Sequence, residues 1–231
     1  MAGNALAATA GASRNAYGTH TLFFYGTLVH PAILERVIGN PGAHLRVRTA
    51  ILPAYATWHV TNVDYPALVS LSNRQPIVPQ GQDAATAAKT TVVPGTVVSG
   101  LTDSDLRYLD LFEGDEYVRS LVEVLLDDSE GTSNAARPRD ASLADILAGL
   151  TPARGAELLQ RAAAEEQSNS SLRVKAEAYV WSAPLAMLED KRWIFADFAR
   201  QKANRWVGST ADHEYTDVDR ERTNPNDVPP A

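Results

Sequence analysis

The chain has 231 residues, 45% of them hydrophobic, which suffices for one sizeable domain with a complete core but makes a second full domain unexpected. A net charge of -7 and a pI near 5.2 argue against nucleic-acid and anionic-membrane surfaces, because both need clustered Lys and Arg. The absence of cysteine excludes disulfides, thiol nucleophiles and Cys-ligated metal sites. The five histidines lack the close spacing of metal ligands, so we expect no metal.

The N-terminal residues 1–19 are rich in Ala and Gly and contain one Arg, so we expect a flexible leader rather than a secretory signal. A targeting role for this leader stays open. No stretch approaches the length of a transmembrane helix, and the lack of cysteine suits a reducing compartment. These features predict a cytoplasmic protein.

Residues 21–25 form an aromatic-rich run that predicts a strand, and the pair Gly26-Thr27 predicts a tight turn after it. A short helix is expected over 28–38, with Pro31 in its first turn. Further elements follow as three short strands at 45–51, 55–61 and 67–71, a polar loop at 74–89, and a β-rich run at 90–101 broken by Pro94-Gly95.

A helix of about three turns is predicted next, between residues 102 and 114. Thr102 followed three residues later by Asp105 resembles a capping box, with Asp in place of the usual Glu or Gln. Gly114 fits the position just past the C-terminus of a helix. Both ends of this helix are therefore marked in the sequence.

Glu113 ends this helix on the same stripe as Leu106 and Leu109, because residues at i, i+3 and i+7 share one side of a helix. We therefore expect its carboxylate to point inward. An apolar environment disfavours the ionised form, so the pKa should rise above the reference value of about 4.3, which suits a general base. Taken alone, such a Glu is more often a helix-end residue whose side chain turns to water.

Residues 118–126 alternate in a way that predicts a largely buried strand. A polar connection is expected over 127–140. Residues 142–167 contain strong helix formers and predict an inserted helical hairpin, broken by Pro152 and Gly155.

The C-terminal part returns to a strand at 172–181 and then predicts one long amphipathic helix over 185–206. Its aromatic and apolar side chains are expected to pack on the core through Trp193, Ile194, Phe198 and Trp206. The tail at 209–231 is polar and is expected to be disordered.

Short strands mixed irregularly with helices favour an α+β fold, with a small mixed β-barrel or curled sheet flanked by helices. A doubly wound parallel sheet would need regular strand-helix alternation. We divide the chain into the leader, a single domain at 20–208 with an insert at 127–171, and the polar tail.

The turn at Tyr25-Gly26-Thr27-Leu28 is a candidate binding element, because the first turn of a helix has backbone N–H groups without internal acceptors. Such a turn can bind an anion or an oxyanion, and Gly26 lets a ligand approach the backbone closely. A Gly-Thr pair at a strand end is by itself a common turn. The glycine-rich phosphate-loop pattern is missing, so we do not expect nucleotide binding.

Four motifs follow one another in this part of the chain: Phe24-Tyr25-Gly26-Thr27-Leu28, Tyr65-Pro66-Ala67-Leu68-Val69, Pro94-Gly95-Thr96-Val97-Val98 leading to Leu109-Asp110-Leu111-Phe112-Glu113-Gly114, and Glu116-Tyr117-Val118-Arg119. In this order and spacing they resemble the gamma-glutamylcyclotransferase-like superfamily, in its avirulence-induced-gene-like and gamma-glutamylamine cyclotransferase-like branch. The resemblance implies a compact mixed β-barrel whose Tyr-Gly-Thr-Leu turn lies opposite the glutamate of the Phe-Glu-Gly sequence.

The resemblance also implies site residues. It places the catalytic base at Glu113 and a substrate-cradling turn at Tyr25, Gly26, Thr27 and Leu28, with an extension to Val29 and His30 left open. It makes Tyr117 a further polar contact with the substrate, whereas Arg119 is expected to pair with a carboxylate such as Glu116 or Glu123. Glu116 is the competing acid. We prefer Glu113, because Glu116 follows the helix stop, where an exposed or ion-paired role is ordinary.

The implied reaction is cyclisation of a gamma-glutamyl compound, in which the α-amine attacks the γ-carbonyl and releases 5-oxoproline together with an amine or amino acid. Glu113 would move the proton from the attacking to the leaving nitrogen, and N–H groups of the turn would donate hydrogen bonds to the carbonyl oxygen. This chemistry needs no cofactor. The expected partner is a small-molecule gamma-glutamyl substrate, and the oligomeric state is open, with a homodimer among the options.

Two alternatives use the same barrel. In the first, the protein binds a small metabolite or a protein partner without turnover, since a fold does not fix a function. In the second, water replaces the internal amine and the enzyme hydrolyses gamma-glutamyl amides. The insert and the C-terminal additions leave the substrate undetermined.

Overall fold

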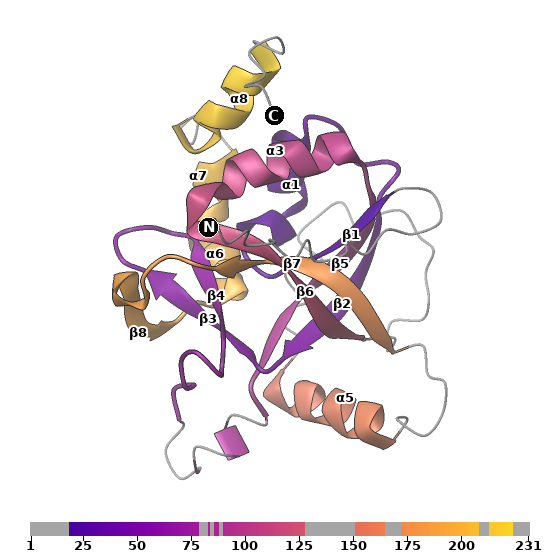
Figure 1. Cartoon of the computed structure of the whole chain (residues 1–231), viewed down its shortest axis with the longest axis vertical. Coiled ribbons are helices and arrows are strands. Elements are labelled where there is room, and N and C mark those ends of the chain that lie inside the picture. Colours follow the sequence, from indigo (N-terminus) through magenta and orange to yellow (C-terminus); the bar gives the residue numbers. More distant parts are fainter. Residues whose placement is uncertain are drawn as a thin grey trace, which may run out of the picture.

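A computed structural model of the chain describes residues 19–78, 83, 86–87, 90–127, 151–164, 172–207 and 213–223 (Figure 1). Nearly all of the expected leader lies outside these residues. So do residues 128–150, which hold most of the expected polar connection and the first arm of the expected hairpin. None of the helices in the described ranges combines the length and apolar character needed to cross a membrane.

The centre of the fold is a closed β-barrel with the strand order β1-β5-β2-β6-β7. The bounds of its strands are His20–Phe24 (β1), Val92–Leu101 (β5), Arg46–Pro53 (β2), Tyr117–Leu126 (β6) and Arg173–Trp181 (β7). Neighbouring strands are antiparallel except β1 and β7, which pair in parallel and close the barrel with Leu22 opposite Glu177. The structure confirms the expected α+β fold with a small mixed barrel.

A second, three-stranded sheet has the order β4-β3-β8 and lies beside the barrel (Figure 1). Its strands are Pro66–Ser70 (β4), Tyr55–Val60 (β3) and Leu188–Arg192 (β8). Trp58 of β3 is paired with Ala67 on one side and Arg192 on the other. This register places the start of β4, and with it Tyr65 and Pro66, near the barrel end where the candidate site lies.

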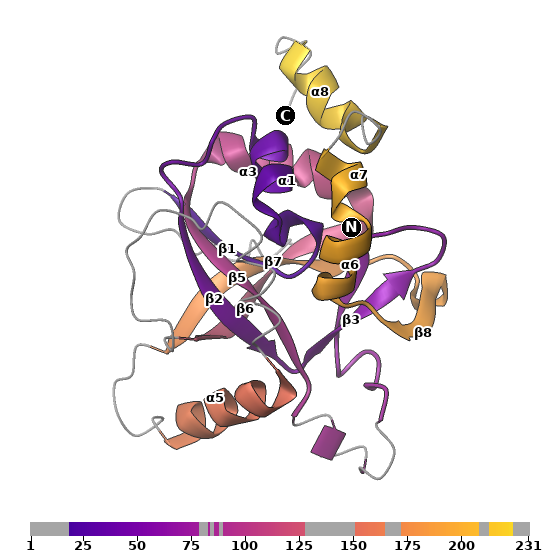
Figure 2. The same cartoon turned by 180° about the vertical axis from the view of Figure 1, so that it is seen from behind.

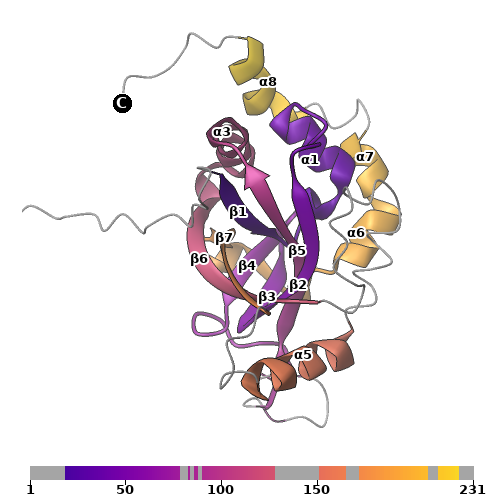
Figure 3. The same cartoon turned by 90° about the vertical axis from the view of Figure 1, so that its right-hand side faces the viewer.

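The helices cover the two ends of the barrel. Helices α1 (Pro31–Ile38), α3 (Asp103–Glu113), α7 (Ala203–Val207) and α8 (Thr216–Thr223) gather towards one end, and α5 (Pro152–Ala164) lies at the other (Figures 1 and 2). Helix α6 (Phe195–Gln201) lies along the side of the barrel (Figure 2). The side view shows the same separation along the long axis (Figure 3). Short 3-10 helices within the described part of the chain include η1 (Thr27–Val29), η2 (Gly114–Glu116) and η4 (Leu185–Met187).

The predicted capping box of α3 is present. The Thr102 hydroxyl accepts a hydrogen bond from the Asp105 N–H at 3.1 Å, and the Asp105 carboxylate accepts one from the Thr102 N–H at 2.9 Å. Gly114 follows the helix with a φ of 66°, a conformation that favours glycine. The start and end of the helix that carries Glu113 are therefore encoded locally.

The helix expected over 28–38 is divided at His30 into η1 and α1. Pro31 restricts the preceding residue to extended conformations, and His30 has a φ of -70° and a ψ of 121°. Pro31 then occupies the first position of α1, where its missing N–H costs no helical hydrogen bond.

Strand β5 runs through Pro94 and Gly95, so the expected break was wrong. The pairing of β5 with β1 ends at Thr96, and Pro94 is paired only with Ile51 of β2. One side of β5 is thus unpaired at Pro94, which is where a strand tolerates proline. A Cβ at Gly95 would lie 2.2 Å from the Phe24 carbonyl oxygen, so this glycine lets β1 pass close by.

The single helix expected over 185–206 was also wrong, since η4, β8, α6 and α7 occupy this range. Pairing of Leu188–Arg192 with β3 overrides the local helical pattern. Trp193, Phe198 and Trp206 are buried as expected, but Ile194 is 54% exposed.

Three further expectations need correction. Helix α5 is not broken at Gly155; a Cβ there would lie 2.7 Å from Val92 Cγ2, so the glycine allows close packing on β5. Strand β6 is buried mainly in its second half, with Val118 50% exposed. The tail expected to be disordered contains α8, and Tyr215 and Val218 bring it into the core at 1% exposure each.

Replacement of Gly95 by alanine should destabilise the barrel by about 3 kcal/mol, because the added methyl group overlaps backbone atoms that cannot move independently. The free energy of unfolding in urea measures this loss. Gly114→Ala is the matched control: its Cβ would meet nothing within 4 Å, so only the strained φ contributes, at about 1 kcal/mol. Equal losses in the two variants would contradict the close approach of β1 to β5.

Candidate active site

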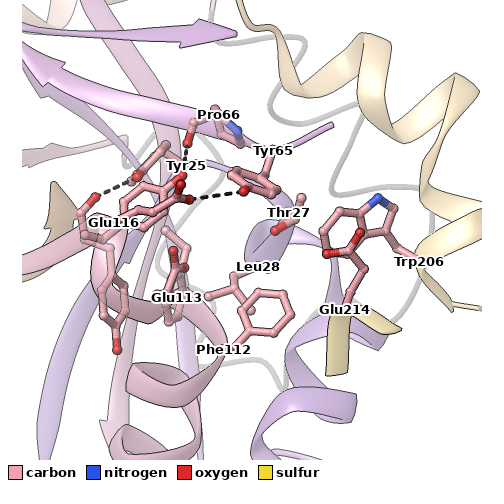
Figure 4. Close-up of a pocket in the computed structure, with 14 residues that line it drawn as sticks. Tyr25, Thr27, Leu28, Tyr65, Pro66, Phe112, Glu113, Glu116, Trp206 and Glu214 are labelled. Atoms are coloured by element: carbon pink, nitrogen blue, oxygen red, sulfur yellow. Dashed lines mark hydrogen bonds between the residues drawn. The ribbon is translucent and has the colours of Figure 1, made fainter. Parts of the chain in front are cut away.

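A cavity of about 140 Å³ lies where the end of β1, the start of β4 and the end of α3 meet (Figure 4). Each residue of the expected site lines it: Tyr25, Gly26, Thr27, Leu28, Glu113 and Tyr117. The remaining lining residues are Phe24, Tyr65, Pro66, Phe112, Glu116, Tyr179, Trp206 and Glu214. Val29 and His30, to which the turn was allowed to extend, are not among them.

The turn from β1 into η1 forms one wall of the cavity. Val29 N–H donates to the Gly26 carbonyl at 3.1 Å and His30 N–H to the Thr27 carbonyl at 3.0 Å, which closes the 3-10 turn. Within the described ranges, the N–H groups of Thr27 and Leu28 have no backbone acceptor. A Cβ at Gly26 would lie 2.8 Å from Pro66 Cγ, so glycine lets the turn pack against the start of β4.

Glu113 is the last residue of α3, and its side chain enters the cavity half-buried (Figure 4). Leu106 and Leu109 on the same stripe are buried, as the periodicity predicted. Among the described residues, nothing donates a hydrogen bond or forms an ion pair with its carboxylate. Burial, and secondarily the negative charge of Asp110, raises the pKa of Glu113 to about 8. The carboxyl group is therefore poised to exchange a proton near neutral pH.

Asp110 lies one helical turn before Glu113 and is held from two sides. Arg119 Nε lies 2.8 Å from its Oδ1, and the Tyr179 hydroxyl donates to the same oxygen at 2.8 Å. Arg119 also bonds both carboxylate oxygens of Glu177 at 3.3 Å. Arg119 thus pairs with carboxylates, as expected, but these are Asp110 and Glu177 instead of Glu116 or Glu123, because the register of β6 and β7 sets Arg119 opposite Tyr179.

Besides Tyr179, three tyrosine hydroxyls around the cavity donate to protein acceptors. Tyr25 donates to the Tyr179 carbonyl at 2.6 Å, Tyr117 to the Pro66 carbonyl at 2.9 Å, and Tyr65 to Glu116 Oε2 at 3.1 Å. Burial raises the pKa of all three, that of Tyr65 to about 12. They stay neutral and fix the shape of the cavity. The Tyr117 hydroxyl proton is therefore already used in the hydrogen bond to Pro66, although the hydroxyl oxygen can still accept a hydrogen bond from a ligand.

Glu116 shares the cavity with Glu113, so the expectation that it is exposed or ion-paired was wrong. It is half-buried and accepts the hydrogen bond from Tyr65, whereas Glu113 has no partner within the described residues. Geometry thus distinguishes the two acids: Glu116 is engaged in a protein contact, and Glu113 is free to meet a ligand.

Several lining residues were not singled out from the sequence. Tyr65 and Pro66 belong to a motif that was recognised, but nothing in it indicated that they border the cavity. Tyr179, Trp206 and Glu214 come from distant segments that carry no local signal. Only the barrel register and the packing of the C-terminal segment bring them to the cavity.

Comparison with known proteins identifies the family of this chain. The family model described as gamma-glutamyl cyclotransferase, AIG2-like, matches residues 22–137, which is half of the chain. The chain belongs to this family.

Its curated relatives include two proteins of Arabidopsis thaliana. Protein AIG2 C is 26% identical over 113 residues, which are 48% of this chain and 56% of the relative. AIG2-like protein C is 31% identical over 110 residues, which are 48% of this chain and 52% of the relative. The chain spans about half the length of the curated relatives it matches.

Solved structures give more distant similarities. A solution structure of an Arabidopsis thaliana protein superposes with a TM-score of 0.45 at 16% identity, covering 94% of this chain and 99% of that one. The crystal structure of a yeast gamma-glutamyl cyclotransferase specific to glutathione gives a TM-score of 0.42 at 13% identity, covering 93% of this chain and 90% of that one.

The raised pKa of Glu113 makes a prediction about stability. A folded-state pKa of about 8 against an ordinary 4.5 means that the folded protein binds this proton more tightly, so stability falls as pH rises from 4.5 towards 8. Glu113→Gln has no carboxyl group to ionise at this position, so its stability should not fall in this way. Its free energy of unfolding should exceed that of the wild type by up to about 2 kcal/mol at pH 6, and by less at pH 5. Urea unfolding at a series of pH values measures the difference.

Asp115→Asn, which removes an exposed carboxylate two residues further on, is the control for a loss of one negative charge. A stability difference between Glu113→Gln and the wild type that stays constant with pH would show that Glu113 is not desolvated.

Proposed function

We propose that this protein is a gamma-glutamyl cyclotransferase-type enzyme that converts a gamma-glutamyl amide into 5-oxoproline and a free amine or amino acid. In this reaction a bond forms between the substrate α-nitrogen and the γ-carbonyl carbon, and the γ-carbonyl–nitrogen bond to the leaving group breaks. The supporting observation is that the Glu113 carboxyl group and the Thr27 and Leu28 N–H groups, none of which has a partner among the described residues, line the same cavity.

Glu113 is suited to the proton transfers of this reaction. Its pKa of about 8 is close to that of a free α-amino group, so a proton can pass between them at little cost in free energy. The ionised carboxylate would take a proton from the substrate ammonium group and leave a nucleophilic amine. The resulting carboxylic acid would give this proton to the leaving nitrogen as the carbon–nitrogen bond breaks. The regenerated carboxylate would take the second proton that the attacking nitrogen must lose to become the lactam N–H and would pass it to the released amine, which returns Glu113 to its starting state.

The turn at Tyr25–Leu28 would stabilise the negative charge that develops on the γ-carbonyl oxygen. The N–H groups of Thr27 and Leu28 are fixed by the 3-10 turn before any substrate binds, so no reorganisation is needed. The cavity is small and partly apolar through Phe24, Leu28 and Phe112, which strengthens such electrostatic interactions. Neutral tyrosines complete the wall without adding charge.

The direct test is incubation of the protein with a panel of gamma-glutamyl amides, with mass spectrometry of the products. We expect 5-oxoproline from at least one amide and a fall in rate of about 10² to 10⁴ in Glu113→Gln, because the proton carrier is lost. Glu116→Gln is the matched control in the same cavity and should lose much less.

Each alternative has its own outcome in this experiment. A near-wild-type rate in Glu113→Gln would exclude Glu113 as the base and make Glu116 the next candidate. Free glutamate in place of 5-oxoproline would identify a hydrolase. A panel without any product, but with measurable ligand binding, would support a barrel that binds without turnover.

The pH dependence gives a second test of the base. The carboxylate form is the active one, so kcat/KM should rise with pH and level off above a pKa of about 8. Asp110→Asn removes a negative charge that helps to raise this pKa but keeps an oxygen for the Tyr179 hydroxyl, so the rise should move to lower pH. An unshifted profile in this variant would argue that another group controls the rate.

A further inference from the structure

A row of charged side chains lies outside the cavity, between helix α3 and the barrel strands β1, β6 and β7. His20 of β1 lies 2.7 Å from Asp103 through its Nε2 and 3.8 Å from Glu177 through its Nδ1. Arg119 of β6 then connects Glu177 of β7 to Asp110. Asp103 is the first residue of α3 and Asp110 lies three residues before its end, so the row holds both parts of this helix to the barrel.

Arg119 is the central residue of this row. Its Nε lies 2.8 Å from Asp110 Oδ1, and its Nη1 donates to both carboxylate oxygens of Glu177 at 3.3 Å. Its side chain is 29% exposed and lines a groove of about 520 Å³ that shares Tyr179 with the candidate active-site cavity. Arg119 does not line that cavity itself, so it can act on a substrate held there only through other residues.

Asp110 connects Arg119 to both parts of the site. It lies three residues before Glu113, on the same side of α3. The oxygen that contacts Arg119 also accepts the Tyr179 hydroxyl at 2.8 Å, and the Tyr179 carbonyl accepts the Tyr25 hydroxyl at 2.6 Å. Because Tyr25 leads from β1 into η1, this chain of contacts relates the position of Glu113 to that of η1.

The charges of Asp110 and Arg119 act on Glu113 in opposite directions. The negative charge of Asp110 disfavours the carboxylate and contributes to the raised pKa of Glu113. The positive charge of Arg119, held 2.8 Å from Asp110, favours the carboxylate. Because both side chains are partly exposed, solvent weakens both effects without changing their signs.

The other titratable groups around Glu113 add no second cation. Facing it across the cavity are the acids Glu116 and Glu214 and the neutral tyrosines Tyr25, Tyr65, Tyr117 and Tyr179. The charged residues of the adjoining groove are Asp110, Asp115, Arg119 and Asp217. Arg107, one turn earlier on α3, is engaged with Glu221. Among the described residues that line the cavity or this groove, Arg119 is therefore the only cation.

We propose that Arg119 is a positioning residue of this site, which holds Asp110 in place and opposes its negative charge, so that the Glu113 carboxylate can form and faces the turn. This inference rests on the proposed cyclotransferase function, because it gives a residue outside the cavity a role in that proton transfer. Arginine suits the role better than lysine. Its planar fork can bond two carboxylates on different elements, whereas the ammonium group of lysine is a single point of charge.

The test is the pH dependence of kcat/KM for a gamma-glutamyl amide that the wild type converts into 5-oxoproline. Arg119→Met removes the positive charge, so the rise in kcat/KM should move up by about one pH unit, which by itself is a loss of about tenfold at pH 6. Arg119→Met combined with Asp110→Asn removes both charges and should return the rise close to its wild-type position. Arg119→Lys keeps the charge without the fork, so the rise should stay in place while the plateau falls about tenfold.

Arg173→Met is the matched control, because Arg173 joins Glu123 across the same two strands, β6 and β7, but borders neither the cavity nor the groove. It should leave both the position of the rise and the plateau unchanged. Thermal unfolding shows whether each variant keeps its fold. If Arg119→Met alone does not fold, comparison of the double variant with Asp110→Asn measures the same upward shift.

Carbon-13 NMR of the glutamate carboxyl groups follows the titration of Glu113 without turnover, and the signal is assigned by its absence from Glu113→Gln. A higher midpoint in Arg119→Met, without 5-oxoproline from any amide of the panel, would reject the cyclotransferase function and support the role of Arg119. Turnover with an unshifted midpoint in Arg119→Met, or with an equal shift in Arg173→Met, would overturn this role and leave the reaction standing. Absence of both turnover and a shift would reject both.

Discussion

Closure of the barrel by β1 and β7 is the interaction on which the rest of the structure depends. These strands are far apart in sequence, and their parallel pairing sets Leu22 opposite Glu177. The same closure brings the Tyr25 hydroxyl to the Tyr179 carbonyl, so the turn after β1 and the last barrel strand share one wall of the cavity. A parallel pair of neighbouring strands needs a long connection between them, which is why this contact cannot form locally. Once it has formed, the positions of the turn and of β6 are set by hydrogen-bonded register.

The cavity places a carboxyl group where solvation is poor, at a cost in stability that the fold must offset. The capping box of helix α3 and the burial of Leu106 and Leu109 stabilise the fold and offset that cost. Asp110 adds unfavourable charge near Glu113 but is itself compensated by Arg119. Such an arrangement is typical of sites at which a perturbed acid serves chemistry, since an ordinary structural carboxylate would be paired.

The C-terminal segment completes the cavity at one end of this barrel. The family match ends at residue 137, yet Trp206 and Glu214 complete the cavity and Tyr215 anchors them to Phe112. The charge and the surface at this end of the cavity therefore depend on residues outside the matched range.

The sequence by itself determined those features that a few neighbouring residues control. The capping box at Thr102, the stop at Gly114 and the stripe that ends in Glu113 could all be read from local spacing, as could the short strands of the barrel. Tertiary structure alone decided that residues 185–206 split into a strand and short helices, that Arg119 pairs with Asp110, and that the C-terminal segment borders the site. Strand register and side-chain packing over long separations fix these contacts, and local propensity carries no information about either.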